Sequence, residues 1–344
     1  MESEASAYQF YVGIDIAADT FTAAWRIPAG KPTLPFTAEQ TSAGFAALQR
    51  RLTASGAAPA EALVVMEATG NDWVALAGTL HEAGYRVAVV NPRQAHHCAT
   101  AQLRRAKTDA LDARALAQLA AALLPTLWTP PPAVYHAVRQ RLVARDGLLA
   151  MRTQARNQRH ALVPWPVVVA AVRQHLDALS ADLDRRIAAL EAAIAAVRKN
   201  GAWAEPRACL TSAPGIGLVT AAWLLVGTLN FALCASPGAL TAYAGLAPVP
   251  RESGRTIRGR AAIGHDGNGR LRTALSMATR SAARDNPAIK ACDDRLRAAG
   301  KPLKVARCAA ARKLLHQAWA LGSKLQRFDP DHQQQHEALP ELAA

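Results

Sequence analysis

The chain has 344 residues, of which 51% are hydrophobic and 19% charged, so it has ample length and apolar content for more than one buried core. No apolar run reaches the ~20 residues that a membrane span requires, and the first fifteen residues lack the layout of a secretory signal, which favours a cytoplasmic protein without membrane partners. The five cysteines stand singly with no C-x-x-C pair, which argues against a zinc site or a disulfide framework.

The positive charge of the chain is concentrated in one stretch. Residues 251–313 carry 16 basic and 5 acidic side chains, a net charge of +11, whereas residues 1–150 carry 13 and 12. A solvated surface would spread such an excess along the chain. Its concentration predicts a polyanionic partner, most simply nucleic acid.

Residues 8–128 show strand and helix patterns in alternation. In residues 8–16 the alternation places Phe10, Val12 and Ile14 on one face of a strand and Gly13 and Asp15 on the other. Further strands are predicted at 20–28, 33–37, 62–67 and 85–90, and helices at 42–53 and 72–83. This order predicts an α/β domain whose sheet has some parallel pairing.

Four acidic residues stand where such a domain places its sites. Asp15 and Glu67 lie at the carboxyl ends of predicted strands, where buried carboxylates are costly unless they are paired or bind a metal. Asp109 and Asp112 lie one turn apart at the start of a helix rich in alanine and leucine, directly after Arg104, Arg105 and Lys107. The alternatives are that Asp15 caps a turn, that Glu67 pairs with an arginine, and that the helical pair complements the helix dipole.

Residues 133–200 follow a stiff proline linker and predict a helical arm. An arginine-rich helix is expected over 133–162 and a second helix over 168–199, whose apolar residues recur every three or four positions. That spacing is typical of a coiled-coil seam, either within one chain or between protomers. The arginines of the first helix either contact nucleic acid or form a solvated face.

Residues 205–320 predict a mainly helical domain. Pro214, Gly215, Ile216 and Gly217 precede an apolar helix and resemble the hairpin of a helix-hairpin-helix element, in which glycines let the backbone approach a phosphate. A turn between two core helices would look the same. Further on, Ser253 lies in a glycine-containing loop with nearby guanidinium groups that suit phosphate binding. These basic residues are Arg251, Arg255, Arg258 and Arg260, and Arg270 and Arg272 further on are also predicted to bind nucleic acid. The polar segment from Phe328 onward is expected to be disordered.

Several short motifs occur together in a recognisable order. GIDIA with Asp15, MEATG with Glu67, VVNP, and R-x-KTD-x-x-DA with Asp109 and Asp112 resemble the RuvC-like (ribonuclease H-like) DEDD domain of insertion-sequence-110-type transposases, which are related to Piv-type DNA invertases and bridge-RNA-guided recombinases. The C-terminal domain of that group is matched by GLAP, Ser253-Gly254, Gly267-Asn268, Leu271-Arg272 and GKPLKVARCAAARKLLH. Where the family has a serine-lysine pair, this chain has Gly264-His265-Asp266, which leaves His265 as a base, a phosphate ligand or an incidental loop residue.

The resemblance implies a function and a set of roles. The acidic tetrad Asp15, Glu67, Asp109 and Asp112 would bind Mg²⁺ or Mn²⁺, and Ser253 would attack DNA to leave a covalent phosphoserine. Arg105, Lys107, Gly215, Gly217 and the arginines around Ser253 would contact nucleic acid. The resemblance further implies a structured guide RNA, dimers or tetramers, and a bacterial protein associated with the nucleoid. The alternatives are a hydrolytic RuvC-like nuclease or Holliday-junction resolvase that forms no covalent intermediate, and a non-catalytic nucleic-acid-binding protein.

Overall fold

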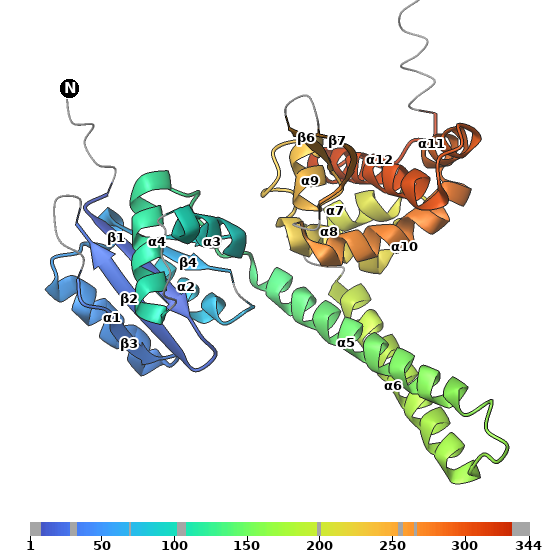
Figure 1. Ribbon diagram of the computed structural model, residues 1–344, viewed down its shortest axis with the longest axis horizontal. Coiled ribbons are helices and arrows are strands. Elements are labelled where there is room, and N and C mark those ends of the chain that lie inside the picture. Colours follow the sequence, from blue (N-terminus) through green and yellow to red (C-terminus); the bar gives the residue numbers. More distant parts are fainter. Residues whose placement is uncertain are drawn as a thin grey trace, which may run out of the picture. The chain divides into compact units, whose positions relative to one another are not determined.

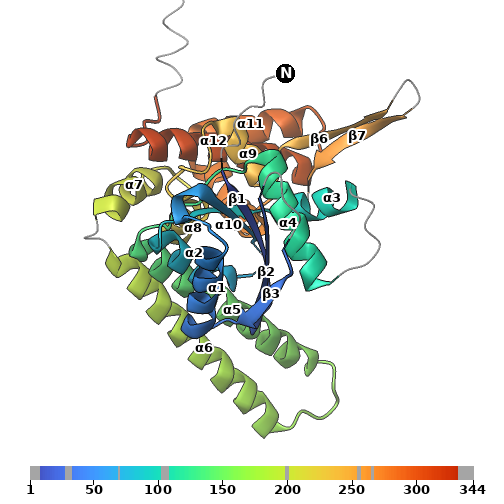
Figure 2. The same ribbon diagram turned by 90° about the vertical axis from the view of Figure 1, so that its left-hand side faces the viewer.

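The computed structural model describes residues 8–27, 33–68, 70–101, 108–197, 201–253, 257–264 and 267–331. The chain divides into two compact units, Met1–Pro130 and Pro131–Ala344 (Figures 1 and 2). The first unit is an α/β domain, and the second holds the helical arm together with the C-terminal helices. Across the described ranges, no helix combines the length and apolar character needed to cross a membrane.

The first unit is built on a mixed sheet of five strands in the order β3-β2-β1-β4-β5. The strands are β1 (Phe10–Ile16), β2 (Thr20–Arg26), β3 (Phe36–Glu39), β4 (Ala62–Glu67) and β5 (Arg86–Val90). Strand β1 runs antiparallel to β2 and parallel to β4, so the predicted α/β class and its partial parallel pairing are confirmed. The third strand begins at Phe36 and not near Thr33, because Pro35 has no N–H to give to the sheet.

Helices cover both faces of this sheet (Figure 1). Helices α1 (Ser42–Ala54) and α2 (Trp73–Glu82) pack on the face that carries Phe10, Val12 and Ile14. Helices α3 (Pro92–Ala101) and α4 (Asp109–Leu123) pack on the opposite face with Tyr11. The predicted alternation along β1 is therefore confirmed, whereas the sequence pattern gave no indication of α3. A short 3₁₀ turn, η1 (Pro59–Glu61), leads into β4.

The arm is an antiparallel pair formed by α5 (Ala133–Ala161) and α6 (Ala170–Ala196) of the same chain. Ion pairs join the two helices: Arg145 with Glu191 at 2.6 Å, Arg152 with Asp184 at 2.5 Å, and Arg159 with Asp177. As the residue numbers rise along α5 they fall along α6, as an antiparallel pair requires. The recurring apolar residues of α6 therefore pack against α5 of the same chain. These arginines, together with Arg156, form ion pairs with acids of α6.

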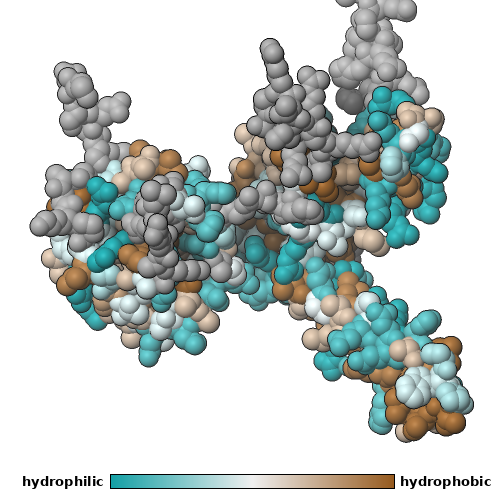
Figure 3. Space-filling model, in the orientation of Figure 1, coloured by the Kyte–Doolittle hydropathy of each residue, from teal (hydrophilic) through white to brown (hydrophobic). Residues whose placement is uncertain are grey.

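The base of the arm is continuous with the C-terminal core. Tyr135, Val138 and Leu142 of α5 and Ile194 of α6 belong to the same buried cluster as the C-terminal helices. The arm was expected to form a segment of its own, and the shared core instead joins it to the residues that follow. Its far end is apolar and open, with Trp165 66% exposed, and Figure 3 shows the hydrophobic surface there.

The C-terminal part surrounds the apolar helix α8 (Leu218–Thr228), which is buried along most of its length. The other helices are α7 (Gly201–Thr211), α9 (Pro237–Tyr243), α10 (Gly269–Asp285), α11 (Pro287–Ala298) and α12 (Leu303–Lys324). The expectation of a flexible loop around Ser253 is wrong, because β6 (Pro248–Ser253) and β7 (Ile257–Ile263) form an antiparallel hairpin. Prolines and glycines disfavour strands, so only the pairing partner across the turn reveals this one.

The boundary expected for the polar tail also changes. Phe328 packs against the C-terminal core, and its backbone N–H donates to Ser212 Oγ at 2.8 Å. The expectation that disorder starts at Phe328 is therefore wrong. Residues 332–344 of the predicted tail lie outside the described residues.

We expect the arm to depend on its apolar base more than on its ion pairs. Ile194→Ala should lower the free energy of unfolding by roughly 2–5 kcal/mol, because it leaves a cavity in a closed core. Arg152→Ala should cost less than about 1 kcal/mol, because the ion pair that it breaks is partly solvated. Urea titration of the full chain measures both. Equal costs would contradict a core shared between the arm and the C-terminal helices.

Candidate functional site

The first two acids lie side by side at one edge of the sheet. The parallel register pairs Ile14 of β1 with Met66 of β4, so Asp15 and Glu67 follow at the next level of the two strands. Leu63 and Val65 face the α3 and α4 side, and alternation along β4 gives Glu67 the same side. Both acidic residues are partly buried.

The other two acids lie in the first turn of α4. Thr108 caps this helix, since its Oγ1 accepts a hydrogen bond from the N–H of Leu111 at 3.3 Å. Asp109 is the first helical residue and is exposed, whereas Asp112 is partly buried. The predicted helix start is confirmed. Arg105 and Lys107, predicted to contact nucleic acid, lie outside the described residues.

A glycine sets how closely α4 approaches the sheet. A Cβ atom on Gly13 would lie 2.1 Å from the carbonyl oxygen of Ala113 and 2.3 Å from the amide nitrogen of Ala117. Only a residue without a side chain allows this contact. Gly13 lies two residues before Asp15, and Ala113 directly follows Asp112, so the contact brings the helical acids to the strand acids. The sequence motifs assigned no role to Gly13, although a glycine inside an apolar strand often marks a close backbone approach.

The charges of the four acids act on one another. The pKa of Asp15 is raised from its ordinary value of 3.8 to about 6, first by burial and then by the negative charges of Asp112, Asp109 and Glu67. Four carboxylates that are separated in sequence by up to 97 positions, from Asp15 to Asp112, are therefore neighbours in space.

The donor set of this cluster suits a hard divalent cation, because every ligand would be a carboxylate oxygen. Within the described ranges, however, no three acidic, histidine or cysteine side chains converge closely enough to hold one ion. The two findings are compatible. The repulsion that raises the pKa of Asp15 also favours side-chain positions that keep the oxygens apart.

The second candidate region is the β6–β7 hairpin. Ser253 is the last residue of β6, and its backbone pairs with Ile257, while Arg251 pairs with Gly259. Arg258 and Arg260 lie on β7, so three of the predicted phosphate-binding arginines share this hairpin with Ser253. Gly254, Arg255, His265 and Asp266 lie outside the described residues.

The base of the hairpin is fixed by residues of the GLAP, Gly267-Asn268 and Leu271-Arg272 motifs. Gly245 has a positive φ of +68°, and a Cβ atom on Gly267 would lie 2.1 Å from its amide nitrogen. The side chain of Asn268 caps α10 by accepting from the N–H groups of Arg270 and Leu271. Arg272 donates from Nη1 to the carbonyl oxygen of Ala244 at 3.1 Å. Arg272 was predicted to contact nucleic acid, and in the structure it braces the chain that leads into β6.

The remaining predicted contacts are divided between packing and surface roles. Gly215 has a φ of +98°, and a Cβ atom there would lie 2.5 Å from the Cβ of Ala282, so this glycine serves the packing of α10. Gly217 precedes α8, and the space around it is open. The guanidinium of Arg270 lies 5.2 Å from the ring centroid of Trp223 and 3.8 Å from Asp146, with half of its side chain exposed.

Comparison with known proteins places these two regions in a family. Residues 12–164 match a family model described as a transposase, and residues 207–293 match one described as a transposase of the IS116/IS110/IS902 family. The chain is 30% identical over 324 residues to the pilin gene-inverting protein of Moraxella bovis, which covers 93% of this chain and 97% of the relative. The pilin gene-inverting protein of Moraxella lacunata matches with the same identity and coverage.

A third relative is an uncharacterized 42 kDa protein of insertion element IS900 from Mycobacterium paratuberculosis, 33% identical over 51% of this chain and 43% of the relative. Together these matches define an enzyme of the transposase and DNA recombinase class, whose substrate is DNA. The chain belongs to the IS110 family of transposases. The expected family resemblance is confirmed.

Adding a side chain at Gly13 should push α4 away from β1 and so separate Asp109 and Asp112 from Asp15. Gly13→Ala forces α4 away from β1, and we expect it to lower the free energy of unfolding by about 1–3 kcal/mol. Gly78→Ala in α2 is the matched control, because nothing lies within 4 Å of the added Cβ atom and alanine favours a helix by about 1 kcal/mol. Urea titration followed by tryptophan fluorescence measures both. If Gly13→Ala left the free energy of unfolding unchanged, the close contact between α4 and β1 would be contradicted.

Removing the charge of Asp15 should stabilise the protein in a pH-dependent way. The pKa of Asp15 is higher in the folded protein than in the unfolded chain. Its contribution to the free energy of unfolding is therefore favourable below about pH 4 and is lost as the pH rises through about 6. The shift corresponds to about 3 kcal/mol, which partial solvation reduces to roughly 1–2 kcal/mol. Asp15→Asn should therefore gain that amount at pH 8 and little at pH 4, as measured by urea titration. Asp19→Asn, at an exposed position nearby, is the control for the substitution itself.

Proposed function

We propose that the protein is the transposase or site-specific recombinase of an insertion sequence, which cuts and rejoins DNA through Ser253 with the help of the acidic tetrad. The observation that carries the proposal is the meeting of Asp15, Glu67, Asp109 and Asp112 from three separate elements. Membership of the IS110 family of transposases supplies the substrate class.

The tetrad is proposed to hold Mg²⁺ or Mn²⁺ in a RuvC-like domain. The mixed sheet with helices on both faces supports this assignment, and so does the all-carboxylate donor set. A bound divalent cation would neutralise charge on the scissile phosphate and polarise its oxygens. The protein itself would supply the placement, through the Gly13 contact and the cap at Thr108.

Ser253 is proposed as the nucleophile. Its Oγ would form a bond to phosphorus while the bond between phosphorus and a sugar oxygen breaks, and the serine proton would end on that leaving oxygen. One phosphodiester replaces another, so rejoining needs no further energy source. The basic residues Arg251, Arg255, Arg258 and Arg260 would bind the phosphate oxygens and stabilise the charge that grows on them.

The need to rejoin cut DNA ends favours attack by Ser253 over hydrolysis by water. Two relatives that match over 93% of this chain are named as gene-inverting proteins, and inversion requires that cut ends be joined again. A nuclease that activates water would leave free ends. The proposal also includes a structured guide RNA and assembly into dimers or tetramers, as the family resemblance implies. The exposed basic residues of the C-terminal unit suit either nucleic acid.

The test is a covalent-adduct assay. The full chain is incubated with end-labelled DNA that spans the element end, with RNA transcribed from the element's flank, and with Mg²⁺. Unaltered protein should yield labelled protein on a denaturing gel. Ser253→Ala should abolish the adduct and reduce cleavage by about 10³-fold or more, because the nucleophile is lost. Asp112→Asn and removal of divalent cations should have the same effect.

Matched controls separate these effects from general damage. Ser276→Ala on the exposed side of α10 and Asp19→Asn near β1 should keep both cleavage and adduct. If Ser253→Ala cleaves normally and no adduct forms with any variant, the protein is a hydrolytic nuclease. Omission of the RNA tests the guide separately, since unchanged activity without it would refute that part alone.

A further inference from the structure

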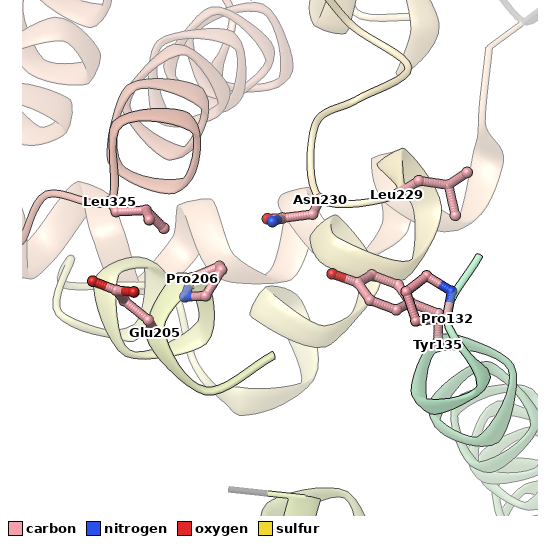
Figure 4. Close-up of a pocket in the computed structure, with 7 residues that line it drawn as sticks. All are labelled: Pro132, Tyr135, Glu205, Pro206, Leu229, Asn230 and Leu325. Carbon is pink, nitrogen blue, oxygen red and sulfur yellow. The ribbon is translucent and has the colours of Figure 1, made fainter. Parts of the chain in front are cut away.

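Two features of the C-terminal unit have no part in the proposed chemistry. One is a pocket of about 310 Å³ around Asn230, which Tyr135, Glu205 and Leu325 help to line (Figure 4). Two of its polar groups are closed off, because Asn230 Oδ1 is buried and Tyr135 is only 4% exposed. The pocket therefore offers a ligand little beyond the carboxylate of Glu205.

The other feature is the turn that joins α11 to α12, two helices that lie side by side (Figures 1 and 2). Residues 295–313 carry seven basic side chains and no acidic one. Arg295, Arg297, Lys301 and Lys304 lie at or beside the turn, and all four are exposed. Within the part of the chain that the structure describes, none of these four forms an ion pair. Their charges are therefore available to a partner from outside the chain.

The backbone of the turn keeps these basic residues close together. Gly300 has a φ of +73°, and the backbone N–H of Lys301 donates to the carbonyl oxygen of Leu296 at 3.0 Å. The N–H of Gly300 donates to the carbonyl oxygen of Arg297 at 2.9 Å, which completes a glycine cap of the kind that ends many helices. Lys301 is thereby held against the helical turn that carries Arg295 and Arg297, and α12 begins two residues later.

The acidic side chains nearest to the turn are already paired within the helices. Asp293 is buried, and its Oδ1 lies 3.4 Å from Nε of Arg307, whose Nη1 donates to the carbonyl oxygen of Thr279 at 3.3 Å. Asp294 accepts from Nζ of Lys290 at 2.6 Å. Because these acids have partners of their own, the end of the helix pair keeps its positive charge.

The composition of this segment indicates which part of a nucleic acid it can contact. Residues 287–313 contain no aromatic residue and no histidine, asparagine, glutamine, serine or threonine. Unpaired bases are typically held by stacking on aromatic side chains, and base edges are often read by amide and hydroxyl groups. A rigid surface of lysines and arginines that lacks these groups suits phosphates, which carry no sequence information.

We infer that the turn between α11 and α12 docks the phosphate backbone of duplex DNA without regard to its sequence. A lysine ammonium binds phosphate as a point charge, and an arginine guanidinium can bind it through two donors. The inference rests on the proposed action on DNA. It adds a surface that holds the duplex, separate from the residues proposed to cut it.

An anionic lipid surface is the rival partner, because Leu303 and Val305 in the first turn of α12 are 55% and 51% exposed. A helix that lies on a membrane presents a long apolar face, commonly with aromatic residues. Here Ala306 and Ala310 are already buried, so the exposed apolar side chains do not continue along α12. Membership of a transposase family, in contrast, supplies DNA as the polyanion.

The test measures binding without cleavage. Two fluorescein-labelled duplex DNAs of about 20 base pairs with unrelated sequences, and a duplex RNA of the same length, are titrated with the full chain in a chelator. Anisotropy gives the affinity at sodium chloride concentrations from about 0.05 to 0.2 M. Unaltered protein should bind the two DNAs within about 3-fold of each other, because phosphate contacts are blind to sequence.

Two double variants should weaken the binding of both DNAs equally. Lys301→Gln combined with Lys304→Gln, and separately Arg295→Gln combined with Arg297→Gln, each remove two exposed charges. Each double variant should lower the slope of log affinity against log salt by about 2, because fewer counterions are released. The affinity should fall by about 10- to 30-fold at about 0.15 M salt.

A matched control removes the same charge elsewhere in the unit. Arg185→Gln combined with Arg186→Gln changes two arm side chains that are 72% and 65% exposed and already pair with Asp182. It should change the affinity by about 2-fold or less, because distant surface charges are screened. Thermal unfolding followed by circular dichroism checks that every variant is folded.

The outcomes distinguish the inference from the proposed function. Unchanged affinity and slope in both double variants, or an equal loss in the control, overturns the docking surface and leaves the recombinase proposal standing. A loss confined to duplex RNA assigns the turn to RNA and also overturns it. So does tighter binding to phosphatidylglycerol vesicles than to DNA that the same variants abolish. Failure of the unaltered chain to bind any DNA contradicts both proposals.

Discussion

The candidate site depends on the contact between the backbone of α4 and the face of β1 at Gly13. A side chain at that position would collide with the backbone of Ala113 and Ala117. Because the contact is between backbones, it fixes both the distance and the rotation of the helix. It therefore determines where Asp109 and Asp112 lie relative to Asp15. The alanines of α4 serve the same purpose, since larger side chains would lift the helix from the sheet.

Close placement of four carboxylates has an energetic consequence. Their mutual repulsion, together with burial, raises the pKa of Asp15 and opposes convergence of the oxygens on one point. A divalent cation is the ordinary remedy for such a cluster. The cluster thus has the character of a functional site whose local instability is balanced by the rigid sheet beneath it.

In the C-terminal unit, too, close backbone contacts position the residues of a candidate site. The glycines of the GLAP and G-N motifs pack on each other, and Asn268 and Arg272 brace the chain at the base of the β6–β7 hairpin. These motif residues position the hairpin that carries Ser253. In the arm, four arginines of α5 form ion pairs with acids of α6. Basic side chains of the C-terminal unit must therefore be sorted by their partners before a role is assigned.

The sequence by itself determined the α/β class, the alternation of β1, the two arm helices and the start of α4, because these depend on local periodicity and capping. The motifs also led to the four acids and to the family. Only the tertiary structure decided that α6 pairs with α5, that Ser253 ends a strand, and that Gly13, Gly215 and Arg272 serve packing. It alone revealed the pocket around Asn230. The physical reason is that these features arise between residues far apart in the chain, where neither propensity nor spacing specifies which surfaces meet.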